Sequence, residues 1–233
     1  MKILCLIPAR SGSKGIPQKN KKILKGKPLI LYTIELAKTL FEINDICIST
    51  DDDDIIKIAE KSGLLVKFKR SALLSNDTAG MRDVIIDAIN FNEGNGCNYD
   101  VVLLLQPTSP IRSRKDIIEM IKLYNSSLDM VVSVGKSHNN PYFNIFEENE
   151  FGLLEKSKNN NFQNRQSAPE VYFYNGSAYL ININSLKSNL ISDFKKIRKF
   201  VMSDINSIDI DTKLDWLICE TILNNNLTFN DEL

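Results

Sequence analysis

Short apolar runs alternate with amphipathic segments through the first half of the chain. The apolar runs are rich in leucine and β-branched residues and show little internal alternation, which is typical of strands covered on both faces. They predict strands over residues 2–8, 45–50, 64–68, 100–106 and 129–134. The segments between them predict helices over residues 28–40, 52–62, 78–91 and 114–125, and Gly63 is placed to end the second of these.

This strand–helix repetition predicts an α/β fold with a mostly parallel sheet and helices on both of its faces. Over residues 136–172 the pattern changes to Asn-rich turns and short aromatic pieces, which predict an inserted β-rich arm. Strands over 177–183 and 198–202 and a closing helix over 211–224 follow it. We therefore expect residues 1–233 to form one domain that carries the arm as an insertion.

Composition limits the kinds of molecule that the chain is expected to bind. Lys plus Arg and Asp plus Glu both number 29, so the chain lacks the basic excess of a general nucleic-acid-binding surface. No apolar stretch approaches the ~20 residues of a membrane span, and strand-like sequence from Lys2 leads into a charged loop rather than a signal peptide. The four cysteines are scattered without a CxxC pair, which argues against a zinc site or a disulfide framework. We expect a cytoplasmic protein without nucleic-acid or membrane partners.

The first predicted strand leads into a glycine- and proline-containing loop that cannot be a helix. This loop, residues 10–20, carries Arg10, Lys14 and Lys19. Backbone N–H groups made accessible by glycine, together with fixed cations, suit a polyphosphate. The loop matches neither a Walker A motif nor GxGxxG, so it predicts a nucleotide site of another kind, with a solvated basic loop as the alternative.

Polar residues also follow the predicted strand 100–106, where Gln106 opens a loop with two prolines. Ligands of parallel sheets bind at the carboxyl ends of the strands, so this loop and the basic loop are expected at one site. The alternative for the second loop is a rigid connection in which Ser113 caps the next helix.

Asp209 and Asp211 would point the same way from an extended segment. Paired carboxylates repel unless one is protonated or a cation lies between them, and Mg²⁺ takes one or two protein carboxylates together with substrate phosphates. The alternative makes Asp211 the N-cap of the last helix. By contrast, the acidic run 51–54 is better explained as the start of a helix than as a metal site.

Two further features bear on chemistry. His138, the single histidine, lies in a polar turn, which argues against a histidine base or a Ser-His-Asp triad. Arg165 lies close to aromatic residues, which suits bidentate capture of a carboxylate or an aromatic-lined contact between subunits.

Six stretches, in this order, resemble one family: IPARSGSKGIPQKN, ISTDD, KRSALLSNDTA, LLQPTSPIR, RQSAPEVYFYNGSAY and IDIDTKLDW. They span nearly the whole chain and resemble the CMP-sialic acid synthetases, or acylneuraminate cytidylyltransferases. The resemblance implies an α/β nucleotidyltransferase fold and a homodimer in which the arm reaches into the partner's site. It implies transfer of CMP from CTP to a nine-carbon 2-keto sugar acid, with release of pyrophosphate.

The resemblance also implies roles for individual residues. Arg10, Lys14, Lys19 and Asn20 would hold the triphosphate and part of the nucleoside. Arg70 and Asp77 would belong to the cytidine pocket. Gln106 would face the sugar acid, with Arg165 and Tyr179 near the sugar. Asp209 and Asp211 would bind Mg²⁺, and Asp211 would also serve in catalysis together with Arg10, Lys14 and Lys19.

The chain departs from many sialic-acid enzymes in the arm, where residues 140–144 read NPYFN without a lysine. This run is more similar to relatives that use legionaminic-type acids, whose more apolar sugars suit an aromatic pair. Met81 stands where some relatives have a small polar residue. Three alternatives remain: a cytidylyltransferase for pseudaminate, one for an eight-carbon keto-acid sugar, and a non-catalytic nucleotide-binding module.

Overall fold

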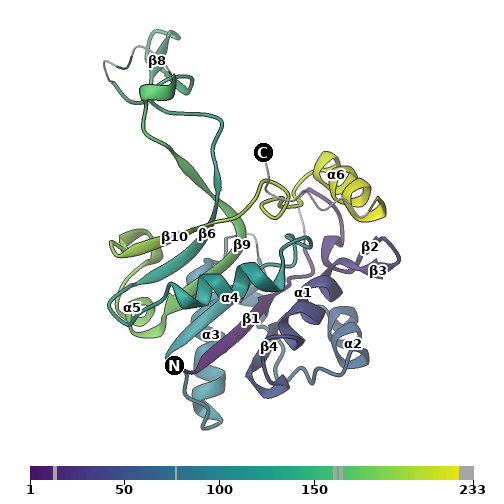
Figure 1. Ribbon diagram of the computed structural model, residues 1–233. Coiled ribbons are helices and arrows are strands. Elements are labelled where there is room, and N and C mark those ends of the chain that lie inside the picture. Colours follow the sequence, from purple (N-terminus) through teal and green to yellow (C-terminus); the bar gives the residue numbers. More distant parts are fainter. Residues whose placement is uncertain (13–14, 77, 160–161, 163–164, 226–233) are drawn as a thin grey trace.

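The computed structural model describes residues 1–12, 15–76, 78–159, 162 and 165–225. A six-stranded sheet with the order β10-β6-β9-β5-β1-β4 runs through the molecule (Figure 1). Neighbouring strands in the sheet are parallel, except that β9 runs antiparallel to both β5 and β6. The predicted mostly parallel α/β fold is confirmed. The strands are β1 (Ile3–Pro8), β4 (Ile46–Ser49), β5 (Val101–Leu105), β6 (Met130–Lys136), β9 (Tyr172–Asn182) and β10 (Ile197–Val201).

Helices cover both faces of the sheet because alternate strand residues bury against opposite sides. In β1, Cys5 and Ile7 belong to one apolar cluster, whereas Leu4 and Leu6 belong to a second. The first cluster includes residues of α1 (Leu29–Lys38), α2 (Asp53–Lys61) and α4 (Arg114–Lys122). The second includes residues of α3 (Met81–Gly94) and α5 (Ile183–Ser188).

A third apolar cluster lies beyond the carboxyl end of β1. It joins the hairpin of β2 (Ile23–Leu24) and β3 (Lys27–Pro28) to α6 (Lys213–Asn224). Ile16, Trp216 and Ile210 are buried in it. This cluster therefore fixes both the end of the basic loop and the segment that carries the two predicted metal ligands.

Two sequence predictions need correction. Residues 64–68 are not a strand, and Leu65 is 68% exposed. β4 pairs with β1 alone among the described strands, and the backbone of the segment after α2 bonds near the end of β4 from Arg70 N–H to Thr50 O at 2.8 Å. The strand expected at 177–183 begins earlier, at Tyr172, because it continues along β6 toward the arm.

Short single-turn elements complete the chain. Gly63 follows the end of α2 with a φ of +90°, which confirms the prediction that this glycine ends the helix. Ser113 caps α4 within a capping box, as expected. The 3-10 turns are η1 (Lys19–Lys21), η2 (Ile43–Asp45), η3 (Ala72–Leu74), η4 (Arg165–Ser167) and η5 (Ile191–Asp193).

The segment between β6 and β9, residues 137–171, projects away from the sheet as an arm (Figure 1). Because β6 and β9 are antiparallel neighbours, the chain leaves and returns at the same place. The arm carries a small hairpin of β7 (Phe146–Glu148) and β8 (Leu154–Lys156). None of its described residues belongs to the three apolar clusters, so the arm buries little of its own apolar surface.

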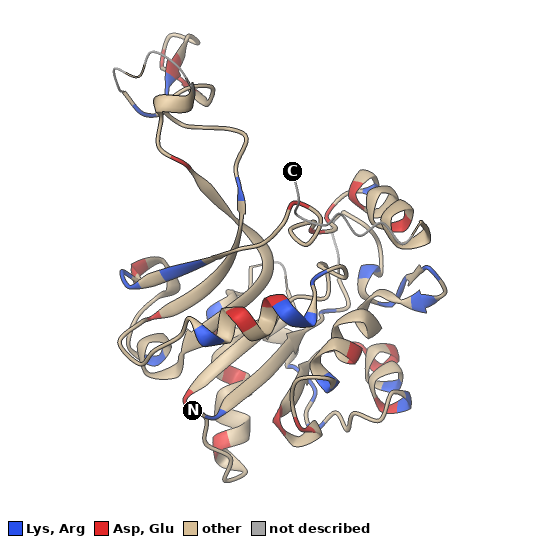
Figure 2. Ribbon diagram, viewed as in Figure 1, with Lys and Arg blue, Asp and Glu red and all other residues tan. Residues whose placement is uncertain are grey.

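Acidic and basic side chains intermix over the helices of the body (Figure 2). In the part of the chain that the structure describes, no helix has the length and apolar character needed to cross a membrane. The four cysteines are free, and Cys5 and Cys219 are buried.

Candidate active site

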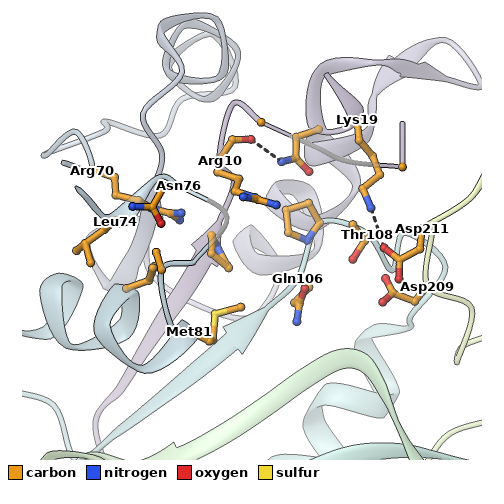
Figure 3. A pocket seen from close by; sticks show the side chains of 17 residues that line it. Arg10, Lys19, Arg70, Leu74, Asn76, Met81, Gln106, Thr108, Asp209 and Asp211 are labelled. Carbon is orange, nitrogen blue, oxygen red and sulfur yellow. Dashed lines mark hydrogen bonds and ion pairs between the residues drawn. The ribbon is translucent and has the colours of Figure 1, made fainter. Parts of the chain in front are cut away.

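A cavity of about 440 Å³ opens at the carboxyl ends of β1 and β5 (Figure 3). Its walls come from the basic loop, the segment 70–84, the loop after β5, and the segment 209–211. The structure thus brings together seven predicted site residues from four distant parts of the chain. These are Arg10, Lys19, Asn20, Arg70, Gln106, Asp209 and Asp211.

The basic loop is held at its start by the end of β4. Ala9 N–H donates to Ser49 O at 2.9 Å, and Ser11 donates to Asp51 from its N–H at 2.8 Å and from its hydroxyl at 2.6 Å. Burial by itself raises the pKa of Asp51, but the hydrogen bonds from Ser11 outweigh it, so the pKa is lowered. Asp51 was expected only to open a helix; its role in holding the loop was not predicted. Lys14 lies outside the described residues.

Lys19 reaches from the loop to the opposite wall. Although it is a lysine, it is only 8% exposed. Its ammonium donates to Ile210 O and to Asp211 Oδ1, the latter at 3.0 Å (Figure 3). Asn20, beside it, donates from Nδ2 to Arg10 O at 3.2 Å. A cation and a carboxylate are therefore paired at the cavity wall, where a phosphate oxygen could take the place of the carboxylate oxygen on the ammonium.

The Asp209/Asp211 pair is placed by Ile210, which is fully buried between them and donates its N–H to Thr108 O at 2.9 Å. Asp211 is not the N-cap of α6, because Thr212 takes that position. The capping alternative for Asp211 is therefore wrong, and its side chain, 73% exposed, is available to a ligand.

The environment of Asp209 suits a divalent cation. Burial raises the pKa of Asp209, and the charge of Asp211 raises it further. Its Oδ1 atom is buried without a hydrogen-bond partner in the described structure. The described residues offer no group of three or more His, Cys, Asp or Glu side chains for a metal. A cation held here would thus take two carboxylates and complete its shell from phosphates and water, as Mg²⁺ does.

Two glycines pack against this pair, and the sequence did not single them out as contacts of it. A Cβ on Gly15 would lie 2.0 Å from Asp211 O. Gly176 has a φ of +70°, and a Cβ there would lie 2.5 Å from Asp209 Oδ2. Such contacts depend on tertiary approach, so only the glycine identities could have hinted at them.

Arg70 occupies the other end of the cavity and is only 5% exposed. It donates from Nε to Ser49 Oγ at 2.9 Å and from Nη2 to Ser49 O at 2.7 Å. Burial lowers the pKa of its guanidinium. Leu74, Asn76 and Met81 line the cavity nearby (Figure 3). Asp77 lies outside the described residues, so its predicted place here remains a prediction.

Two predicted residues are not on the cavity wall. Tyr179 is half-buried in β9, with its ring edge-on to Tyr174 at 6.2 Å between centroids. Burial raises the pKa of Tyr179, and the charge of Asp209 raises it further. Arg165 begins η4 within the arm, which contributes no described residue to the cavity of its own chain. Their predicted contacts with a sugar remain predictions.

Comparison with known proteins agrees with this arrangement. The family model "Cytidylyltransferase" matches residues 4–209. The chain is 37% identical to "Post-translational flagellin modification protein B" of Campylobacter coli, over 95% of this chain and 94% of that protein. It is 32% identical to "CMP-N,N'-diacetyllegionaminic acid synthase" of Legionella pneumophila, over 96% of this chain and 97% of that one.

Among solved structures, CMP:2-keto-3-deoxy-manno-octonic acid synthetase complexed with CTP superimposes with a TM-score of 0.73. The match is at 16% identity and covers 97% of this chain and all of that one. This likeness shows the fold. Since the family model spans most of the chain and full-length relatives exceed 30% identity, the chain belongs to the cytidylyltransferase family.

Proposed function

We propose that this protein transfers CMP from CTP to the anomeric hydroxyl of a sialic-type nonulosonic acid and releases pyrophosphate. The observation that carries the proposal is one cavity that joins the basic loop, with its buried Lys19, to a pair of carboxylates. The names of the relatives support the class of acceptor: a Campylobacter jejuni CMP-N,N'-diacetyllegionaminic acid synthase is 35% identical over 95% of this chain. We place the reaction in the cytoplasm, where cells keep CTP.

A legionaminic-type acid is the favoured acceptor. Relatives named for it align along their whole length, whereas the N-acylneuraminate cytidylyltransferase of Streptococcus agalactiae is 31% identical and matched over 52% of its length. A pseudaminic acid cytidylyltransferase of Campylobacter jejuni is 42% identical over 51% of this chain, which keeps pseudaminate as the second candidate.

The triphosphate is proposed to lie along the basic loop. Arg10 and Lys19 neutralise charge on its oxygens, with Lys14 as the third cation. Negative charge grows on the pyrophosphate as it leaves, and cations fixed beforehand stabilise it without reorganisation. Lys19 is already desolvated, so its ammonium need only exchange a carboxylate oxygen for a phosphate oxygen. Arg70, Asn20 and Asp77 hold the nucleoside.

Asp209 and Asp211 would hold Mg²⁺, which supplies further neutralisation of the phosphates when bound. Asp211 is the proposed acceptor of the proton of the sugar hydroxyl, since its carboxylate is exposed to the cavity and no histidine lines it among the described residues. Gln106 orients the sugar acid from the floor of the cavity.

A homodimer completes the proposed site. The arm exposes large apolar side chains, including Phe151 at 77% and Leu154 at 70%. Such surface is characteristic of an interaction site, and we propose that a second copy covers it. Arg165 on the arm and Tyr179 at its base would then bind sugar, Arg165 in the partner's cavity.

The proposal is tested by pyrophosphate release from CTP with legionaminate, pseudaminate, N-acetylneuraminate and an eight-carbon keto-acid sugar in parallel reactions. We expect turnover that requires both a sugar and Mg²⁺ and is fastest with legionaminate. EDTA should abolish it, and added Mg²⁺ should restore it. If no keto-acid sugar supports turnover while CTP still binds, the protein is a nucleotide-binding module instead.

A further inference from the structure

Arg112 lies beneath the cavity and has no part in the proposed chemistry. Its guanidinium is buried, with the residue 5% exposed. It donates to Ser177 O from Nη1, and from Nη2 to Thr33 Oγ1 at 2.6 Å and Gln106 O at 2.5 Å. These acceptors belong to β9, α1 and the end of β5. All three are neutral, and no carboxylate in the described part of the chain forms an ion pair with Arg112.

A buried guanidinium whose hydrogen-bond acceptors are all neutral is an expensive way to stabilise a fold, even though the charge of Asp209 favours its charged form. Burial lowers the pKa of Arg112 to about 10, so it stays charged at neutral pH. The surrounding sheet is apolar, and β5 is buried along its whole length. A hydrophobic side chain of similar volume would fit that setting at a lower desolvation cost, which indicates a role beyond stability.

Two of the three acceptors of Arg112, the carbonyls of Gln106 and Ser177, belong to residues next to side chains of the cavity. The N–H of Gln106 donates to Ser177 O at 3.2 Å, so the residue after β5 and the middle of β9 are joined directly as well as through the guanidinium. Gln106 lines the cavity. Ser177 follows Gly176, against which Asp209 packs so closely that a Cβ would lie 2.5 Å from the carboxylate. Movement of either peptide group would therefore shift Gln106 or Asp209.

We propose that Arg112 is a positioning residue for the transfer reaction: its planar guanidinium fixes the carbonyls of Gln106 and Ser177 and thereby aligns Gln106 and Asp209 in the cavity. This inference rests on the proposed function. A lysine would keep the charge but not the rigid fork that reaches three acceptors at once.

The test compares Arg112→Lys with Arg82→Lys. Arg82 is the control, because it also donates to three acceptors, the main-chain carbonyls of Leu186, Lys187 and Asn189, although its side chain is 29% exposed and pairs with Asp83. We expect Arg112→Lys to lower kcat about 10²-fold, as a shift of about 1 Å can. The KM for CTP should stay within about threefold, since the nucleotide end is held by other residues. Arg82→Lys should lower Tm less, because its side chain is partly exposed, and leave kcat unchanged.

Hydrogen exchange gives a readout that does not depend on turnover. In Arg112→Lys, exchange of the amides of Gln106 and Ser177 should quicken about tenfold or more relative to the rest of the sheet, and in Arg82→Lys it should not. Wild-type activity in the same assay reports on the proposed function separately. If Arg112→Lys is unstable, Thr33→Val removes one acceptor of the guanidinium and should lower kcat three- to tenfold, which corresponds to a barrier raised by about 0.7–1.4 kcal/mol.

Unchanged kcat together with wild-type exchange at Gln106 and Ser177 would overturn the inference. So would loss of protection spread evenly over the sheet with Tm lowered and kcat intact, because that pattern means that Arg112 only stabilises the fold. If the wild-type protein shows no turnover but amide exchange at Gln106 and Ser177 is faster in Arg112→Lys, the proposed function is refuted. The structural part of the inference, that Arg112 fixes these two carbonyls, is then still supported.

Discussion

The body and the arm of this molecule differ in how far they bury their apolar residues. In the body, β1, β5 and β6 are covered on both faces, and the carboxyl ends of β1 and β5 open into one cavity. In the arm, the hairpin of β7 and β8 is exposed at every residue. The body therefore closes its own core, whereas the hairpin of the arm leaves its apolar side chains exposed in the single chain.

This difference separates two kinds of contribution to function. Groups of the body are fixed by the fold itself, as Ile210 fixes Asp209 and Asp211 by filling a buried position. In the proposed homodimer, groups of the arm, Arg165 among them, would gain a fixed position only when the partner covers the arm. Substitutions in the body should therefore alter activity at every protein concentration. Substitutions in the arm should alter activity by weakening dimerisation.

The largest expected effect is that of Asp211→Ala, which removes a proposed metal ligand and proton acceptor of the body. We expect kcat to fall at least about 10³-fold. The fold should persist, because the side chain is largely exposed and Thr212, not Asp211, caps α6. Thermal unfolding and pyrophosphate release check both points. Asp204→Ala is the control, since Asp204 is also exposed and lies in the same connection; near-normal turnover of Asp211→Ala would exclude both roles.

A smaller but still large effect is expected from Gly15→Ala. The added Cβ would meet Asp211 O at 2.0 Å, so either the loop or the carboxylate segment must move. We expect kcat/KM for CTP to fall about 10²-fold. Gly12→Ala, in the same loop, has no atom within 4 Å of its added Cβ and should lose far less. Equal losses in the two variants would show that loop flexibility, not the contact with Asp211, is what matters.

In the arm, Phe151→Ser combined with Leu154→Ser should weaken self-association. Covering each side chain contributes about 1.5–3 kcal/mol, so the dimer dissociation constant should rise at least about 10²-fold. Sedimentation equilibrium over a dilution series measures it. Leu190→Ser, at a position 57% exposed on the body, is the matched control. A monomeric wild-type protein, or an unchanged dissociation constant in the double variant, would refute the proposed use of the arm.

Arg165→Ala should raise the KM for the sugar about tenfold and that for CTP much less, since one charged contact to a carboxylate is lost. Mixing this variant with Asp211→Ala sharpens the test. If Arg165 serves the partner's cavity, each mixed dimer contains one site with both residues intact, and a component with the wild-type KM appears. If Arg165 serves its own chain, no such component forms.

The sequence was sufficient for the repeating strands and helices and for seven residues of the cavity. It succeeded there because buried strands have a strong apolar signal, and because the alternation around Ile210 placed Asp209 and Asp211 on one side. The prediction of a strand failed at residues 64–68. This run is apolar enough for a strand, but it forms no strand pairing with β4 at the edge of the sheet.

Tertiary approach explains the other omissions. The contacts of Ser11 with Asp51 and of Arg112 with Ser177 join segments 40 and 65 residues apart, and no local pattern announces them. Gly15 and Gly176 could be noted as glycines but not as neighbours of the carboxylates. Such contacts hold the site in place. They depend on the three-dimensional arrangement of the sheet, so a sequence pattern cannot predict them.

The smallest expected effect concerns Asp215, which belongs to the body but acts only on stability. Its carboxylate accepts from Thr212 N–H at 2.6 Å and from Asp211 N–H at 3.1 Å. Burial alone raises the pKa of Asp215, and these hydrogen bonds lower it overall. A carboxylate with a lowered pKa stabilises the fold above its unfolded value of about 4, and this contribution is lost as pH falls through the folded value.

Asp215→Asn should therefore lower the free energy of unfolding by about 1 kcal/mol at pH 7, the usual value of a helix cap. The difference from wild type should shrink as pH falls below about 4, because protonation removes the same charge from the wild-type protein. Urea unfolding at several pH values measures it. Dimerisation should not change, since Asp215 is far in sequence from the arm and caps a helix of the body. A pH-independent difference would mean that hydrogen-bond geometry rather than charge stabilises the start of α6, directly after the carboxylate pair.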